Sequence, residues 1–191
     1  MSKITSTLIC LIAFQLGHAQ FKSSELILKN GNKLIVLGKI QGNNFKYKNH
    51  SKDKTKTLHF SEIDYVRIRY SENDIKTFKY FKITDTEKHK VLEEIEKGKV
   101  VLYTTSTNGY VNPFGAGMQR IAYTIENYYV KKQSDKEVLH LGSNQLFTKN
   151  FIEGASSFFE DCIELVEKIK SEKFKKSDIV EIVKFYNTHC N

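Results

Sequence analysis

The chain has 191 residues, and its 30 lysines and arginines outnumber its 22 aspartates and glutamates, which gives a formal net charge of +8. Arg67, Arg69 and Arg120 are the only arginines, and the lysines are scattered among acidic residues. Nucleic-acid binding typically relies on clustered basic residues and on the planar guanidinium of arginine, so the composition argues against nucleic acid as a partner.

Residues 1–19 carry the three parts of a secretory signal peptide. A lysine lies near the start, an apolar run covers residues 8–14, and Gly17 and Ala19 are small residues just before a cleavage site at Gln20. The apolar run is shorter than the roughly 20 residues of a membrane span, and no second such run follows. We therefore expect an exported protein that does not span the membrane and is periplasmic, associated with the outer surface or secreted. The alternative is an N-terminal element buried in the fold.

Residues 20–142 predict a β-rich body. Apolar and polar side chains alternate over short stretches such as 45–48 and 65–70, and turn signals such as Asn30-Gly31 separate them. Short strands separated by frequent turns are typical of an antiparallel sheet, folded as a sandwich or as a small barrel.

Residues 88–97 are ambiguous. Val91, Leu92 and Ile95 match a helical stripe, and Gly98 is a residue that commonly follows the end of a helix. The flanking segments read as strands, so a helix here would interrupt the sheet.

The connection over residues 105–120 is the most distinctive stretch. It lies between two predicted strands and is longer than a hairpin requires, and it contains the only proline of the chain, Pro113. Long loops on rigid scaffolds often carry recognition. We interpret it as a binding loop for a glycan, peptide or protein of the cell envelope, with Tyr110, Phe114 and Arg120 as contacts; the alternative is a disordered excursion.

Arg67 and Arg69 form a second candidate binding site. They share one face of a predicted strand with Tyr65, where two guanidinium groups could bind an anion. The alternative is that this face is the solvated outer surface of the sheet.

Residues 143–191 change to a helical period. An amphipathic helix is expected from about residue 147, broken near Gly154, and a second helix follows Asp178, so that the two form a hairpin packed on the body. Cys162 and Cys190 can meet at the end of this hairpin. In an exported chain we favour a disulfide between them over two reduced, buried thiols.

The sequence lacks the common catalytic and metal-binding motifs. No two histidines are four residues apart, and there is no Cys-x-x-Cys, Gly-x-Ser-x-Gly or phosphate-binding glycine loop. We therefore predict no catalytic residue, no metal site and no cofactor.

Three segments carry a resemblance to known sequences: residues 28–33, 126–132 and 158–187. They resemble uncharacterised exported proteins of Bacteroidetes-type bacteria, across most of the chain and in the same order of elements. The resemblance implies export and supplies no activity. Residues 25–70 are also similar to a small Sm-like barrel, but RNA binding would conflict with export, and no binding residue is transferred from that similarity.

Together these patterns predict an α+β protein with a β-rich body and a C-terminal helical hairpin. The length suits one domain, or two small domains packed together. We expect a non-catalytic binding or structural protein of the bacterial cell envelope, with an unknown envelope component as partner. The alternatives are an enzyme that acts on envelope polymers through dispersed residues, and adsorption to anionic envelope surfaces through lysines.

Overall fold

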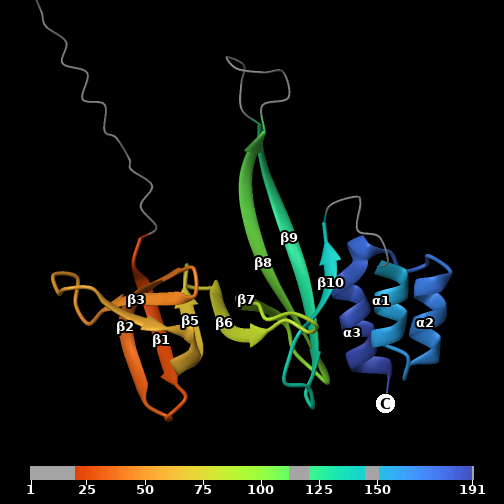
Figure 1. The fold of residues 1–191 in the computed structure, drawn as a ribbon, viewed down its shortest axis with the longest axis horizontal. Coiled ribbons are helices and arrows are strands. Elements are labelled where there is room, and N and C mark those ends of the chain that lie inside the picture. The colour runs from red at the N-terminus through yellow and green to blue at the C-terminus, as the bar shows by residue number, and fades with distance from the viewer. Residues whose placement is uncertain (1–19, 112–120, 145–150, 191) are drawn as a thin grey trace, which may run out of the picture.

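The computed structural model describes residues 20–111, 121–144 and 151–190 (Figure 1). The expected signal peptide, residues 1–19, lies outside the described residues. The described strands are β1 (Lys22–Leu28), β2 (Lys33–Gln41), β3 (Asn44–Lys48), β4 (Lys56–His59), β5 (Ile63–Arg69), β6 (Ile75–Lys82), β7 (His89–Glu96), β8 (Val100–Val111), β9 (Ile121–Lys132) and β10 (Leu139–Ser143). The helices are α1 (Phe151–Phe158), α2 (Ile163–Lys170) and α3 (Ile179–His189), with the short 3₁₀ helices η1 (Phe60–Glu62) and η2 (Lys176–Asp178).

The ten strands form one antiparallel sheet in the order β10-β9-β8-β7-β6-β5-β1-β2-β3-β4. Neighbours in sequence are mostly neighbours in the sheet, as expected when short turns connect the strands. The predicted α+β class and antiparallel body are confirmed. The sheet is open, so neither a sandwich nor a small barrel is confirmed.

The N-terminal part of the sheet encloses its own apolar cluster. Inward-facing side chains of β1, β2, β3 and β5 meet Phe60 of η1 there. Phe60 also reaches β6, because its ring lies 6.3 Å from the ring of Tyr80. The Asn-Gly signal forms the β1–β2 turn, where Gly31 has a φ of 86°, a conformation that favours glycine. The fully or nearly fully buried members are Leu26, Val36, Phe45, Phe60, Ile63, Val66 and Ile68.

Residues 89–96 form strand β7, so the helical alternative for the segment 88–97 is wrong. β7 pairs with β6 on one side and with β8 on the other. Val91 packs against the N-terminal cluster, while Leu92 is buried in a different cluster on the other face of the sheet, with Tyr103 and Tyr129. Both faces of β7 are therefore occupied, which removes the simple alternation that identifies a strand in a sequence.

The helices cover one face of the C-terminal strands, as Figure 1 shows beside β10. Three helices are present among the described residues, where the sequence predicted two. The break does not fall at Gly154, which lies inside α1, but between Phe158 and Ile163, where α1 ends and α2 begins. The buried cluster that joins helices and sheet is Val100, Leu102, Val130, Leu141, Phe151, Ala155, Phe159, Cys162, Leu165, Ile169, Ile179, Ile182, Val183, Tyr186 and Cys190.

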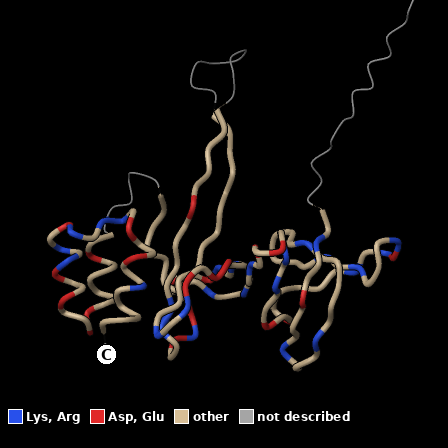
Figure 2. Tube along the Cα trace, turned by 180° about the vertical axis from the view of Figure 1, so that it is seen from behind, with Lys and Arg blue, Asp and Glu red and all other residues tan. Residues whose placement is uncertain are grey.

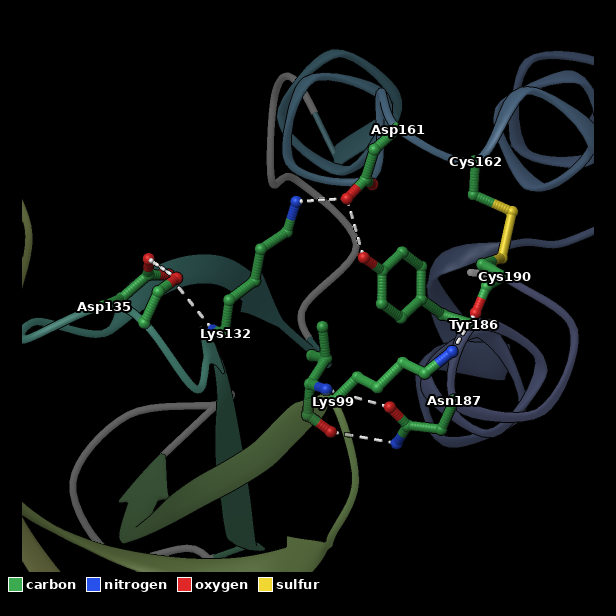
Figure 3. A network of polar contacts seen from close by, with 10 residues as sticks. Lys99, Lys132, Asp135, Asp161, Cys162, Tyr186, Asn187 and Cys190 are labelled. Atoms are coloured by element: carbon green, nitrogen blue, oxygen red, sulfur yellow. Dashed lines mark hydrogen bonds and ion pairs between the residues drawn. A yellow bond between two sulfur atoms is a disulfide. The ribbon is translucent and has the colours of Figure 1, made fainter.

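The predicted disulfide between Cys162 and Cys190 is confirmed. Their Cα atoms are 5.6 Å apart, and the bond joins the start of α2 to the end of α3 (Figure 3). Both residues are buried. The disulfide therefore fixes α2 and α3 to each other.

Polar contacts tie the helices to the sheet (Figure 3). The ammonium of Lys132 on β9 lies 2.8 Å from the carboxylate of Asp161, which also accepts a 2.7 Å hydrogen bond from the Tyr186 hydroxyl. The side chain of Asn187 accepts from the backbone N–H of Val100 and donates to its carbonyl, at 2.9 Å each. Asn187 thus pairs with the start of β8 as a strand residue would.

Candidate functional site

β8 and β9 continue well beyond the body of the protein as a two-stranded ribbon (Figure 1). They pair in unbroken register from Val100 opposite Lys132 to Val111 opposite Ile121. We call residues 105–111 of β8 and 121–127 of β9 the arm. None of the described residues in the arm is among the buried side chains, and the buried residues that border its base are Thr104, Tyr129 and Ser143. The arm therefore adds no side chain to the buried cores.

One face of the arm is apolar. Side chains opposite each other in an antiparallel pair lie on the same face, so Val111, Ile121, Tyr123 and Ile125 share one face. Val111 is 46% exposed, Ile121 52% and Tyr123 40%. The Tyr123 ring lies directly over Gly109, where a Cβ would be 2.4 Å from the ring. The missing side chain of Gly109 therefore allows this aromatic ring to lie flat on the ribbon.

The opposite face of the arm is polar with one aromatic side chain. The Thr124 hydroxyl donates a 2.9 Å hydrogen bond to the side-chain oxygen of Asn108 across the two strands. Tyr110 lies nearer the end of β8 and is 70% exposed. A tyrosine that is held on a paired strand and not covered by its own protein is suited to binding, because aromatic side chains are enriched at interfaces.

The arm has almost no charge, although 27% of the residues of the whole chain are charged. Between Val100 and Ile125, Arg120 is the only charged residue in the sequence. Figure 2 shows the arm in tan apart from one acidic position near its base, whereas lysines and acidic residues mark the rest of the molecule. Exposed sheet edges usually carry charged side chains that prevent association with other chains, and the β8 edge of the arm has none.

The outer edge of β9 is closed only at the base of the arm. The backbone N–H of Asn144 donates to the carbonyl of Glu126 at 2.9 Å, and the Asn144 side chain accepts from the N–H of Glu126 at 3.1 Å. The same side chain donates to the carbonyl of Thr124 at 3.2 Å. Asn144 thus extends the pairing of β10 by one residue, and no described strand covers β9 beyond it.

A groove of about 710 Å³ lies at the base of the arm on the β8 side. Its walls come from the arm, from β6 and β7, and from the β2–β3 turn. Lys76 and Glu93 form an ion pair of 2.9 Å in it, and the hydrogen bond that the Lys76 ammonium donates to the Glu93 carboxylate raises the pKa of Lys76. Lys76 is therefore held in its protonated form. The lining residues are Ile40, Gly42, Asn43, Tyr70, Asp74, Lys76, Phe78, Lys90, Val91, Glu93, Thr104, Thr105 and Ser106.

Of the three contacts predicted for the binding loop, Tyr110, Phe114 and Arg120, the structure describes only Tyr110. Tyr110 lies on the arm, exposed and within a strand, so the connection is shorter than the sequence predicted. Phe114 and Arg120 lie outside the described residues. Tyr123 and Ile121 on β9 were not predicted as contacts, although the charge-free run that contains them is visible in the sequence.

Arg67 and Arg69 lie on β5, a different part of the sheet from the arm. The Arg67 guanidinium is 3.4 Å from the Glu25 carboxylate and stacks 5.0 Å from the Tyr65 ring centroid. Arg69 donates to the backbone carbonyl of Glu72 at 3.4 Å. Both side chains thus have partners within the chain, and the anion site stays a prediction beside the alternative of a solvated outer face.

Within residues 20–111, 121–144 and 151–190, the side chains form no cluster of three or more His, Cys, Asp or Glu that could hold a metal ion. None of the helices in those ranges is both long and apolar enough to cross a membrane. A comparison with known protein families, curated proteins and solved structures found no match to the chain. The geometry of the arm is therefore the main guide to function.

Proposed function

We propose that this chain is an exported, non-catalytic binding protein of the bacterial cell envelope, and that the arm is its partner-binding surface. The resemblance to exported proteins of Bacteroidetes-type bacteria and the signal-like residues 1–19 support export. The Cys162–Cys190 disulfide is consistent with an oxidising compartment.

The observation that carries the proposal is the extension of β8 and β9 beyond the last buried residues of the fold. Ordering a residue in a strand costs conformational entropy of about 1–2 kcal/mol, which burial normally offsets. The described residues of the arm bury nothing comparable, because Val111, Ile121 and Tyr123 remain between 40% and 52% exposed. A ribbon with one exposed apolar face gains its stabilising contacts when another molecule covers it.

The proposal is tested with two substitutions and a control. We expect Tyr110→Ser and Tyr123→Ser together to weaken binding of a partner recovered from the envelope fraction of the source bacterium by at least about tenfold, because exposed aromatics often dominate interface energies. Ile163→Ser is the control, since Ile163 is 74% exposed on α2, away from the arm. The measurement is a titration of the recovered partner against each purified variant.

Partner binding that is unchanged in the double variant but weakened by Ile163→Ser would transfer the binding surface to the helices. The proposal would be contradicted if no recovered partner bound the double arm variant more weakly than it bound the Ile163→Ser control.

A further inference from the structure

β7 and β8 separate at the base of the arm and leave a fork in the sheet. Their last paired residues in the direction of the arm are Glu93 and Thr104. Beyond this pair β7 continues toward His89 beside β6 alone, and β8 continues toward Val111 beside β9 alone. In the described part of the chain, both sides of the fork are therefore strand edges without a neighbour.

The register shows which backbone groups face the fork. The bonds to Asn144 establish that Glu126 directs its N–H and carbonyl away from β8, and in an antiparallel pair the residue opposite it, Ser106, directs its own groups away from β9. Because this direction alternates along a strand, Asn108 and Tyr110 also direct their groups outward on this edge. On β7, Glu93 directs its backbone groups toward Thr104 of β8, so by the same alternation the backbone N–H and carbonyl groups of Val91 and His89 also face the fork.

The groove at the base of the arm lies in this fork. Val91 and Glu93 line it from the β7 side, and Thr105 and Ser106 line it from the β8 side. Phe78 and Val91 are partly buried and give the groove an apolar floor, while Ser106 is exposed. An extended chain that lies along β8 could thus place its side chains against apolar surface on one side.

We propose that the fork binds an extended polypeptide segment of the partner, which pairs with the β8 edge at Ser106, Asn108 and Tyr110 and enters the groove beside Val91. This inference rests on the proposed binding function and specifies the chemistry of the partner. Main-chain hydrogen bonds to an exposed edge provide the affinity in strand addition, and the side-chain groove provides the selectivity.

The geometry favours a polypeptide over the other candidate partners. Donors and acceptors that alternate along a strand edge match the spacing of another strand, whereas a glycan has hydroxyl groups in no such repeat. The β8 edge of the arm has no charged side chain, so neither an acidic nor a basic segment is repelled by it. A second copy of this chain is the remaining strand donor, and the experiment below separates it from a foreign segment.

The test blocks one edge of the arm at a time with proline. Ser106→Pro removes an N–H that faces the fork without disturbing the pairing of β8 with β9, and proline is tolerated on such an edge. Ala122→Pro is the matched control. Ala122 lies two residues from Thr124 and four from Glu126 on β9, so its N–H points the same way as theirs, to the opposite edge of the arm. The probe is a phage-displayed library of random linear decapeptides, selected on the purified protein and on both variants.

We expect peptides that bind the unmodified protein and the Ala122→Pro variant and that bind Ser106→Pro at least about tenfold more weakly. Two versions of a selected peptide are then compared, one methylated at its odd-numbered backbone nitrogens and one at its even-numbered nitrogens. One version should lose binding and the other should keep it, because only alternate N–H groups of a strand face its neighbour.

Recovery of no peptides, or of peptides that bind Ser106→Pro equally well, would overturn the inference. Self-association of the protein that Ser106→Pro abolishes, without peptide binding, would assign the fork to a second copy. Loss of partner binding in the Tyr110→Ser and Tyr123→Ser variant with no effect of Ser106→Pro would overturn strand addition while leaving the proposed function in place.

Discussion

Asp161 holds three elements together with a single side chain. Its carboxylate accepts hydrogen bonds from Lys132 on β9 and from Tyr186 on α3, and it lies itself between α1 and α2 (Figure 3). The Lys132 ammonium also lies over the rings of Phe158 and Tyr186, at 5.5 and 5.8 Å from their centroids. The Lys132–Asp161 ion pair thus connects the helices to the sheet.

This connection predicts an acid-sensitive contribution to stability. Burial tends to raise the pKa of Asp161, but the hydrogen bonds from Lys132 and Tyr186 outweigh it and hold the pKa below its ordinary value of 3.8. A carboxyl with a lowered folded-state pKa stabilises the protein above about pH 4, and this contribution is lost as the pH falls through the folded-state pKa. We expect a loss of under about 1 kcal/mol, because the side chain is 43% exposed and solvent screens the pair.

The measurement is the free energy of urea unfolding from pH 6 down to pH 2.5, with Asp161→Asn as the comparison. The variant should be less stable than the unmodified protein at pH 6, and the difference should shrink toward pH 2.5. A difference between the two proteins that stays constant with pH would contradict this role of the carboxylate.

At the level of elements, the disulfide fixes the helical layer. It joins residues 28 positions apart, and a cross-link of this span stabilises a protein by about 3–4 kcal/mol in the chain-entropy model. We expect the double substitution of Cys162 and Cys190 by alanine to lower the urea midpoint, and a reducing agent to have the same effect on the unmodified protein but none on the variant. Equal midpoints for oxidised and reduced protein would show that the helices are held by packing alone.

β7 shows why one strand could not be predicted from the sequence. Val91 and Leu92 are adjacent and face two different apolar clusters, so both are apolar. A register irregularity between Glu94 and Glu96 then shifts the alternation. The two effects together place apolar residues at helical spacing, and only the neighbouring strands reveal that the segment is extended.

The arm shows a different limit of sequence reasoning. An exposed strand segment has no buried face, so Thr105 to Asn108 give no alternating pattern and resemble a loop. The composition was nevertheless informative, because it identified Tyr110 as a contact candidate, although its neighbours on β9 and the fork depend on the pairing register. Where a face is buried on one side, as in β5 and α3, the periodicity predicted the element correctly.

The whole molecule divides into a body that folds and an arm that extends from it. The apolar clusters fill the body, and most of the charged residues belong to it, whereas Glu126 near the base is the one charged residue in the described part of the arm (Figure 2). The chain has a formal net charge of +8, a balance that favours repulsion between copies, and the arm reaches beyond the charged surface of the body. This division explains how an apolar surface can stay exposed without being needed for folding.

The most direct test of this account is to shorten the arm. Replacing residues 108–124 by Asn-Gly keeps Thr107 opposite Ile125 as the last pair of a two-residue hairpin, the loop length for which Asn-Gly is favoured. The account predicts a thermal midpoint within a few degrees of that of the unmodified protein together with complete loss of partner binding. A shortened protein that fails to fold, or that folds and still binds its partner, would contradict the claim that the arm exists for binding.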